Sequence, residues 1–515
     1  MERAARWLPP AIALLVPTLF IPVSVDAFVL PRASLALAGG GLLAAAGLVA
    51  GRRSLGPLRL PVLAVAVTAL AAAALSIAPA VSLVGTYVRY ESLPMRLAYL
   101  GLFCGAAWIG ERDRTVAAFL IGCAVAAVET LYQAWSHSPP RPDGNLGQPN
   151  LLGALLAMAI PLALDRARTA RRPGGRGWLA LAALCGVALV VSTSRSGWLG
   201  VLAGVSVLAV FTATPRWRRV ALPGAAIVLA VAAGLVVFSP LRGLNEDTGA
   251  ARLGVWRDSL SVIAERPLLG WGEDTMGLVY GRHQTADWEP GHNFDRAHSM
   301  PLDLAATQGV LGLAACAWLF GAWWLGVWRR RDLQGVAGVA GAACAYLTWS
   351  LLNFDWAPAT AAVWLLAGAA WPGTDAPAAR RPYTDPPPRW ERRKAVLALM
   401  AAAAGLAFAV PPMAADVALY AGSPDRAAAL DPLQPRYQAA RGDLAGLRRA
   451  GALGDPDPST YVKLGVAEVQ AGYPEAAVVA YRRALERYPY DADARRRLAP
   501  AAPAAAIGSR RAASG

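Results

Sequence analysis

Apolar residues in this chain gather in long runs that are separated by shorter polar stretches. A membrane-spanning helix needs about 20 mainly apolar residues. Runs of this kind begin near residues 11, 33, 60, 94, 115, 150, 178, 196, 220, 300, 335, 357 and 395. The pattern therefore predicts an all-α fold, a polytopic membrane helical bundle of about 12 to 13 spans.

One polar stretch, residues 239–299, is much longer than the others and is rich in ionisable side chains. In a membrane protein, such a concentration marks the place where chemistry should be sought first. The expected organisation is a membrane domain at 1–371 that includes this large loop, a Pro- and Arg-rich linker at 372–394, a last span at 395–413, helical repeats at 416–500 and a disordered tail at 501–515.

Arginine residues are concentrated in alternate loops. The loops of one parity carry Arg3, Arg6, Arg52, Arg53, Arg59, Arg112, Arg114, Arg166, Arg168, Arg171, Arg172, Arg176, Arg216, Arg218, Arg219, Arg329, Arg330, Arg331 and the linker arginines. Those of the other parity hold little beyond Arg32, Arg89, Arg96, Arg141 and Arg195. The positive-inside rule makes the first set cytoplasmic. We therefore expect a multi-pass protein of the cytoplasmic (inner) membrane, with the large loop, the repeats and all four histidines on the outer side.

Composition agrees with a membrane protein, because 56% of the 515 residues are hydrophobic, only 16% are charged and the mean hydropathy is +0.38. The net charge of +15 does not indicate nucleic-acid binding, since the basic residues form short clusters between apolar runs rather than one basic face. The five cysteines lie inside apolar runs and predict neither a disulfide framework nor a metal site. The first apolar run is expected to be a retained helix.

The segment "STYVKLGVAEVQAGYPEAAVVAYRRALERYPYD" has the spacing of a tetratricopeptide repeat. Gly465 and Ala477 allow two antiparallel helices to approach closely, Tyr481 fills the seam, and Pro489 ends the second helix. Stable arrays of such repeats generally need at least three units. This region is therefore either supported by a protein partner or packed on the membrane domain.

Two motifs on the expected outer side contain polar groups suited to a substrate. In "YVRYESL", Arg89 either contacts an anion or snorkels from an interfacial aromatic belt. In "GNLGQPNLLG", glycines and proline make a tight turn, and Gln148 and Asn150 offer amide groups for sugar hydroxyls or phosphate oxygens. A turn that caps the following helix through Asn150 explains the second motif equally well.

A third motif, "STSRSGWLG", places Arg195 in a very short outer turn, with Ser194 beside it as a further substrate contact. An arginine at a membrane boundary is costly without a partner. Its planar guanidinium matches phosphate oxygens, so a phosphate-containing ligand is the expected partner.

The large loop contains an amphipathic helix at 251–264, whose apolar positions are Leu253, Trp256, Leu260 and Ile263. This helix either lies in the membrane interface or uses Arg252, near its start, to hold an anion. The segment 281–294 is expected to be a flexible lid over the acceptor. At the end of the loop, His298 stands at the mouth of the next span, where it can act as a general base that is oriented by Asp295.

These motifs, together with "ARLGVW", "ERPLLGWG" and "AHSMPLDLAATQGVLGL", resemble the O-antigen ligase and polymerase-like superfamily over roughly residues 89–313. The resemblance implies a metal-independent membrane glycosyltransferase without a cofactor, of the general lipid-donor transferase fold type, whose donor is a glycan on undecaprenyl pyrophosphate. Many members carry C-terminal tetratricopeptide-like repeats. Carried over, Arg195 and Arg252 hold the pyrophosphate and His298 acts in catalysis. The histidine in this family is often followed by Asn, whereas this chain has Ser299.

The resulting hypothesis is inverting transfer at the outer membrane surface, with Arg89 as a weaker third contact to the donor. The acceptor decides between a polymerase (a glycan), a ligase (a lipid core) and an O-linked protein oligosaccharyltransferase (a protein hydroxyl). Two other classes remain: a flippase or exporter of lipid-linked oligosaccharide, and a non-catalytic scaffold that recruits protein partners through the repeats. Ionisable residues such as Asp26, Glu129 and Asp303 lie near outer span ends. A transporter usually needs them near the midplane, which disfavours the flippase.

Overall fold

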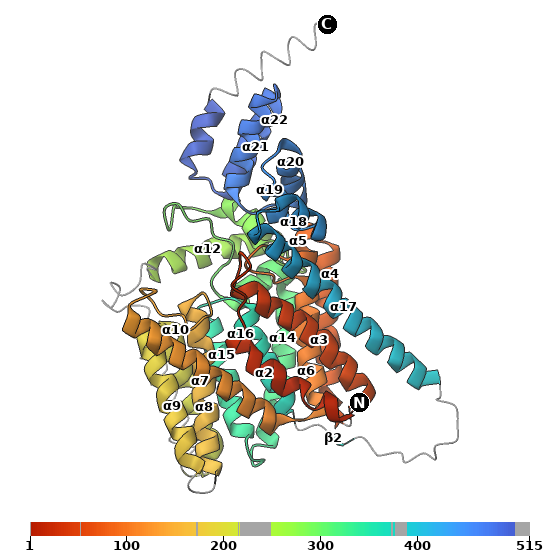
Figure 1. Ribbon diagram of the computed structural model, residues 1–515, viewed down its shortest axis with the longest axis vertical. Helices are drawn as coiled ribbons and strands as arrows, with labels where there is room; N and C mark the ends of the chain where they lie inside the picture. Colours follow the sequence, from red (N-terminus) through yellow and green to blue (C-terminus); the bar gives the residue numbers. More distant parts are fainter. Residues whose placement is uncertain are drawn as a thin grey trace.

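The structure, a computed structural model, describes residues 2–51, 53–170, 174–214, 216, 249–371, 374–375 and 389–499. The described residues form a bundle of helices with a C-terminal helical repeat region above it (Figure 1), so the expected all-α polytopic architecture is confirmed. The expected span near residue 220, the start of the large loop at 239–248 and the tail at 501–515 lie outside the described residues.

In the first half of the chain, the described elements are helices and one short strand. Its elements are α1 (Glu2–Ala5), α2 (Leu8–Thr18), α3 (Val29–Ala50), β1 (Arg53–Ser54), the 3-10 helix η1 (Gly56–Leu58), α4 (Arg59–Ala74), α5 (Pro79–Val84), α6 (Leu93–Ile109), α7 (Arg112–Ser136), α8 (Pro149–Thr169), α9 (Gly174–Val191) and α10 (Arg195–Thr212).

The second half holds the large loop, the last membrane helices and the repeats. Its elements are α12 (Gly249–Glu265), α13 (Met276–Val279), the 3-10 helix η3 (Tyr280–His283), α14 (Met300–Arg329), α15 (Val336–Ser350), α16 (Ala357–Ala370), β2 (Thr374–Asp375), α17 (Arg389–Tyr420), α18 (Pro424–Leu430), α19 (Pro435–Ala440), α20 (Leu444–Leu453), α21 (Pro458–Gln470) and α22 (Pro474–Arg487).

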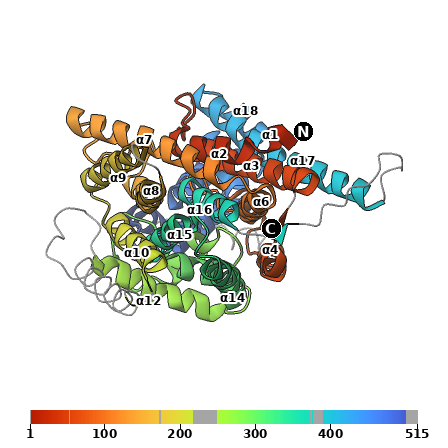
Figure 2. The same ribbon diagram turned by 90° about the horizontal axis from the view of Figure 1, so that it is seen from below.

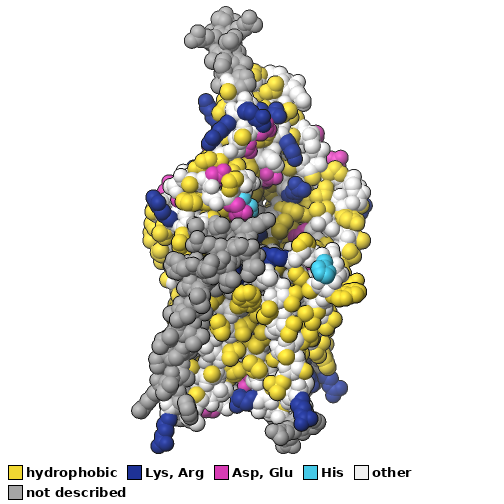
Figure 3. Space-filling model, turned by 90° about the vertical axis from the view of Figure 1, so that its left-hand side faces the viewer, with side chains coloured by type: hydrophobic (Ala, Val, Ile, Leu, Met, Phe, Trp, Pro, Cys, Tyr) yellow, Lys and Arg dark blue, Asp and Glu magenta, His cyan; other side chains and the backbone are white. Residues whose placement is uncertain are grey.

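Helices occupy the expected apolar segments wherever the chain is described. Eight are long and apolar enough to cross a membrane: α3, the stretch Gly56–Ala74, α7, α8, α9, α10, α14 and α17. The apolar helices α6, α15 and α16 are shorter. The protein is therefore a multi-pass membrane protein. One face of it shows a broad apolar band, with arginine and lysine side chains mostly toward the two ends (Figure 3).

Helices α15 and α16 lie near the middle of the bundle, with the other membrane helices around them (Figure 2). All 14 residues of α16 are buried. Its sequence, "APATAAVWLLAGAA", is dominated by alanine, so neighbouring backbones can pack against it closely on every side. This central pair carries the connection 351–356, which reaches the candidate site described below.

The large loop is anchored by a break in α14. Gly309 has a left-handed backbone (φ 68°), and a Cβ there would stand 2.2 Å from the backbone of Leu268. Because this position is glycine, the segment from Pro267 can lie against the break, with Val310 N donating to Pro267 O at 2.7 Å. The loop that brings α12 to the membrane domain is thus held by backbone hydrogen bonds.

Helix α17 differs from the last span expected at 395–413. It begins at Arg389, inside the expected linker, and continues to Tyr420 through Pro411 and Pro412. Of the linker, Thr374–Asp375 pairs with Arg53–Ser54 as two short antiparallel strands, and residues 376–388 lie outside the described part. Helix α18 follows α17 after a short turn at residues 421–423.

The repeat region packs on the large loop, which is the second of the two arrangements left open by the sequence. Gly281 is so close to α22 that a Cβ would stand 2.4 Å from Glu486 O. Arg487 Nη1 donates to Leu278 O at 2.6 Å. The segment 281–294, expected to be a flexible lid, thus contacts the repeats, because Tyr488 and the backbone near Pro456 also bond to it.

Candidate active site

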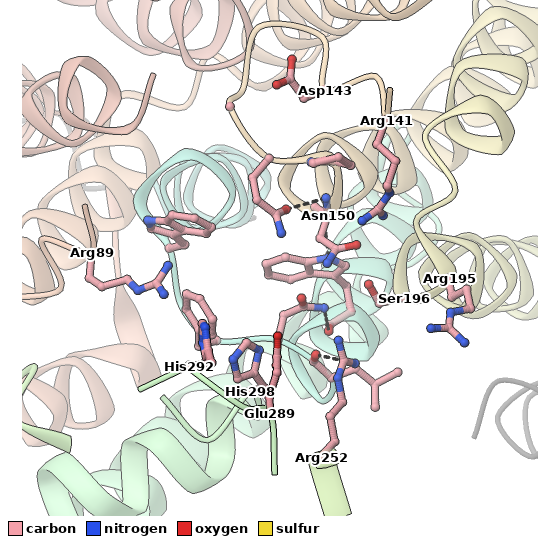
Figure 4. A pocket seen from close by; sticks show the side chains of 18 of the residues that line it. Arg89, Arg141, Asp143, Asn150, Arg195, Ser196, Arg252, Glu289, His292 and His298 are labelled. Carbon is pink, nitrogen blue, oxygen red and sulfur yellow. Dashed lines mark hydrogen bonds between the residues drawn. The ribbon is translucent and has the colours of Figure 1, made fainter. Parts of the chain in front are cut away.

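A cavity of about 890 Å³ lies on the repeat-facing side of the bundle. Its walls come from separate stretches of the chain, as Figure 4 shows. The lining residues are Arg89, Pro139, Pro140, Arg141, Asp143, Gly147, Gln148, Pro149, Asn150, Arg195, Ser196, Arg252, Leu253, Trp256, Glu289, His292, His298, Trp349, Leu352, Asn353, Phe354 and Trp356. Six of the eight residues expected from the sequence line it, and the other two, Asp295 and Ser194, contact lining residues.

The turn before α8 is a helix cap, but Asn150 is not the capping residue. Gln148 Oε1 accepts from the backbone N–H groups of Asn150 (2.5 Å) and Leu151 (3.1 Å). Trp349 Nε1 donates to Asn150 O at 3.0 Å. Gln148 thus holds Asn150 at the cavity wall, and the expected cap through Asn150 is corrected to Gln148.

Arg195 is the first residue of α10, and Ser194 is the N-cap of that helix, accepting from Gly197 N at 3.4 Å. Ser194 Oγ also donates to Asn150 Oδ1 at 3.2 Å. Ser194 therefore joins two turns that are far apart in sequence and holds Asn150, which lines the cavity. The positive end of α10 and the guanidinium of Arg195 both face the cavity.

Arg252 comes from α12, which lies across the bundle rather than along it (Figure 1). Leu253 and Leu260 of its expected apolar stripe are exposed, at 49% and 58%. Val255 and Val262, on another face, are buried against the loop. Arg252 Nη1 donates to Leu352 O at 3.2 Å, so its guanidinium is directed to the cavity side of the 351–356 connection.

His298 stands directly before the N-cap of α14, at the membrane boundary where it was expected. Its ring packs edge-on against Phe354 (centroids 5.3 Å apart) and Phe294 (6.1 Å). The preceding peptide is held by Asp303 of the first turn of α14, which accepts from Ala297 N at 2.7 Å. These contacts place the imidazole at the cavity, between Glu289 and His292 in Figure 4.

Arg89 and Asp295, expected in different roles, form an ion pair. Asp295 accepts from Arg89 Nε at 2.7 Å and from Arg89 Nη2 at 3.0 Å, a bidentate arrangement. The guanidinium also lies over the rings of Phe354 (4.7 Å) and Trp356 (4.8 Å). Arg89 is therefore held by an ion pair and two aromatic rings where it lines the cavity.

The environment of Asp295 favours its ionised form. Burial alone would raise the pKa of this carboxyl, but ion pairing and hydrogen bonding with Arg89, with smaller contributions from Arg296 and His298, hold the pKa well below its usual range. Arg296 is itself buried and paired with Asp274. A negative charge therefore persists beside His298 at neutral pH.

A buried charged cluster lies beneath the cavity and joins the loops that form it. Arg96 of α6 pairs with Asp355 (2.8 Å) and lies 3.8 Å from Glu273. Glu91 accepts from Tyr99 Oη at 2.6 Å, and Asp355 accepts from Tyr346 Oη at 2.8 Å. The Arg96–Asp355 pair joins α6 to the 351–356 connection. Breaking a buried ion pair leaves an uncompensated charge, so this pair fixes the two elements relative to each other.

We expect Glu91 to make the folded state less stable as the pH rises. Burial raises the pKa of Glu91 to about 8, the charge of Asp355 adds to this, and Arg96 opposes it. The folded protein then keeps a proton that the unfolded chain releases above its ordinary pKa of about 4.3. Between these two values the free energy of unfolding falls with rising pH, by up to about 1.4 kcal/mol per pH unit.

Glu91→Gln should therefore raise the Tm of the purified protein more at pH 8 than at pH 5. The matched control is Glu475→Gln, an exposed carboxyl on α22. Thermal unfolding in detergent at both pH values measures the effect. Equal pH dependence in the wild type and the Glu91 variant would contradict this assignment.

An aromatic wall of the cavity, formed by Trp349, Phe354 and Trp356 around the 351–356 connection, was not predicted from the sequence. The cluster of aromatic and amide side chains in "WSLLNFDWAP", between two apolar runs, was a usable signal. Arg141 was also missed as a site residue, although it is one of the few arginines in the other set of loops. Among the described residues, no group of three or more His, Cys, Asp and Glu side chains is arranged to hold a metal ion.

The fold and the cavity together define a multi-pass membrane protein with an arginine-lined, aromatic cavity on the side of the bundle that bears its repeats. Residues 180–317 match the family model described as O-antigen ligase, and residues 458–501 match a tetratricopeptide repeat model. These matches confirm the resemblance to O-antigen ligases with C-terminal repeats. The family implies glycosyltransferase or ligase-type activity. No curated protein matches the chain. The matched region contains Arg195, Arg252, Asp295 and His298 but not Arg89, Gln148 or Asn150.

Proposed function

We propose that the protein transfers a glycan from undecaprenyl pyrophosphate to an acceptor hydroxyl. The observation that carries this proposal is the meeting of Arg195, Arg252 and His298, from three separate segments, at one cavity. Cationic groups for a pyrophosphate and an imidazole for a hydroxyl are the two requirements of such a transfer. The donor consists of a lipid tail and a glycan. A cavity at the end of a membrane bundle suits it, because the tail can stay in the bilayer while the glycan lies outside.

The donor pyrophosphate binds between Arg195 and Arg252. Both guanidinium groups match phosphate oxygens and stabilise the charge that develops on the leaving group. Arg141, held by a hydrogen bond from its Nε to Thr193 Oγ1 at 3.0 Å, lies on the same side of the cavity and adds to this positive field (Figure 4). Besides the Arg89–Asp295 pair, three arginines and two acidic residues line the cavity, so its charge suits an anion.

His298 takes the proton from the acceptor hydroxyl as its oxygen attacks the anomeric carbon. The bond from that carbon to the pyrophosphate oxygen breaks, and undecaprenyl pyrophosphate leaves from the opposite face, with inversion. Asp295 stabilises the imidazolium that forms. Arg89, expected to be a weaker third contact to the donor, instead holds Asp295 in place. The reaction needs no metal, because the leaving group is already a good one.

The sugar binds against the aromatic wall. Trp349, Phe354 and Trp356 offer ring faces, while Asn150 and Asn353 offer amide groups for hydroxyls. The acceptor is a glycan, a lipid core or a protein hydroxyl. The last of these makes the protein an O-linked oligosaccharyltransferase.

The site faces the outer side of the cytoplasmic membrane. The end of α8, with Arg166 and Arg168, and the start of α9, with Arg176, lie at the opposite end of the bundle from the repeats, as do α1 and the beginning of α17 (Figure 1). The positive-inside rule then makes that end cytoplasmic. A C-terminal tag that is accessible only from the cytoplasm would contradict this orientation.

The function is tested with purified protein in liposomes and two donors, a glycan on undecaprenyl pyrophosphate and the same glycan on undecaprenyl monophosphate. We expect release of undecaprenyl pyrophosphate, with a chelator present, and a much slower reaction of the monophosphate donor. Movement of the lipid-linked glycan across the bilayer without release would identify a flippase instead. Loss of activity with the chelator, restored by a divalent cation, would contradict the metal-independent mechanism.

A further inference from the structure

The loop 85–92, which carries Arg89, has an unusual backbone. Val88 and Tyr90 both have left-handed conformations, with φ values of 74° and 56°. For a β-branched or bulky residue this conformation is costly, and it persists only where surrounding contacts hold it. Two such residues on either side of Arg89 indicate that the position of its guanidinium depends on the groups that hold the loop.

Hydrogen bonds from five other parts of the chain hold this loop. They join Gly85 O to Gln434 Nε2 (3.1 Å), Thr86 N to Asp274 Oδ2 (2.6 Å), Tyr87 Oη to Asp416 Oδ1 (2.7 Å), Val88 O to Trp356 Nε1 (2.8 Å) and Tyr90 Oη to Asp26 Oδ2 (3.1 Å). Two of these partners come from the C-terminal part of the chain: Asp416 lies near the end of α17, and Gln434 directly precedes α19.

Asp416 is the centre of the C-terminal contacts. It is fully buried near the end of α17, and its second oxygen accepts from Asp26 N at 2.9 Å. The hydroxyl of Tyr437, also fully buried, lies 3.2 Å from Asp416 Oδ1, and its ring meets that of Tyr87 at a centroid distance of 5.9 Å. A buried carboxylate with three donors around it strongly restrains the elements that it joins.

The repeats hold a second loop of the site. Tyr488 Oη accepts from Gly291 N at 2.7 Å and lies 3.0 Å from Asp287 Oδ1, while Asn293 Nδ2 donates to Pro456 O at 3.0 Å. These bonds restrain the segment that carries Glu289 and His292 and leads to Asp295 and His298. The C-terminal region thus contacts the loop that carries Arg89 and also the segment that leads to Asp295.

We propose that Asp416, Gln434, Tyr437 and Tyr488 of the C-terminal region are positioning residues of the transfer site: they hold the two loops that carry Arg89 and His298 in the geometry needed for proton transfer. This inference rests on the proposed function. Because the contacts act on the Arg89–Asp295–His298 side and not on Arg195 or Arg252, loosening them slows the chemical step and leaves donor binding intact. A misplacement of about 1 Å can cost about 100-fold in rate.

The test uses full-length variants that remove single hydroxyl groups, Tyr437→Phe and Tyr488→Phe, and the stronger change Asp416→Asn. Tyr420→Phe, an exposed tyrosine on the same helix as Asp416, is the matched control. We expect about 10- to 100-fold lower kcat, with an unchanged KM for the undecaprenyl pyrophosphate donor. Hydrogen–deuterium exchange should become faster at 85–92 in Tyr437→Phe and Asp416→Asn, and at 285–293 in Tyr488→Phe.

Unchanged kcat in all three variants overturns the proposal, and so does a lower kcat with unchanged exchange at both loops. A raised donor KM with an unchanged kcat would assign the C-terminal region to donor binding instead. If the wild type itself shows no transfer, the proposed function fails. Exchange, which needs no turnover, then decides by itself whether these residues hold the loops.

Discussion

His298→Ala is expected to lower kcat about 100- to 10,000-fold, which is the usual effect of removing a general base. The imidazole of His298 lines the cavity, an imidazole can take a proton near neutral pH, and the persistent charge of Asp295 lies beside this one. In the proposed mechanism the donor pyrophosphate binds elsewhere, between Arg195 and Arg252. Its affinity should therefore hardly change, and the loss should appear in kcat rather than in donor binding.

The measurement is a single-turnover assay of undecaprenyl pyrophosphate release, with donor binding determined separately. His137→Asn is the control, because His137 is exposed on the turn after α7 and its left-handed backbone (φ 55°) suits asparagine. An unchanged rate in His298→Ala would remove this residue from the mechanism. A rate restored by added imidazole would support its role as the base.

Arg252→Ala and Arg195→Ala are each expected to lower kcat/KM about 100- to 1,000-fold, as the removal of one charge-stabilising group does in other sites. In the proposed site both residues act on the same pyrophosphate, so the double variant should lose less than the product of the two single effects. Lysine at either position should recover only part of the activity, since a point charge cannot make two parallel hydrogen bonds.

Steady-state rates with varied donor concentration measure these effects. Arg257→Ala is the matched control for Arg252, because Arg257 is on the same helix but exposed and outside the cavity lining. Normal kcat/KM values in both single variants would contradict the proposed pyrophosphate site. Fully additive losses would indicate that the two arginines bind separate parts of the substrate.

Several residues of the candidate site could be predicted from the sequence because their residue types are unfavourable or unusual at a membrane boundary. Arg195 is an arginine in a short outer turn, where the positive-inside pattern disfavours it. His298 comes directly before a helix start that Ser299 and Pro301 mark. Both line the cavity, so an unfavourable residue at a membrane boundary was an informative signal.

The roles of Arg89, Asp295 and Ser194 could not be read from the sequence. Arg89 and Asp295 are 206 residues apart, and no periodic pattern relates them. Ser194 stabilises the wall through Asn150, which belongs to a different turn. Hydrogen bonds of this kind depend on side-chain geometry at sub-ångström precision, which residue types and spacing do not encode locally.

The sequence by itself determined the all-α membrane class and the approximate positions of the spans. It also indicated that the long polar loop ending at His298 contributes to the candidate site. These follow from apolar length and from charge placement, which depend on neighbouring residues alone. The tertiary structure alone decided that Arg89 pairs with Asp295, that the 351–356 connection forms the aromatic wall, and that the repeats pack on the loop 278–293. Those contacts join distant segments, so they arise only when the helices pack and buried polar groups find their partners.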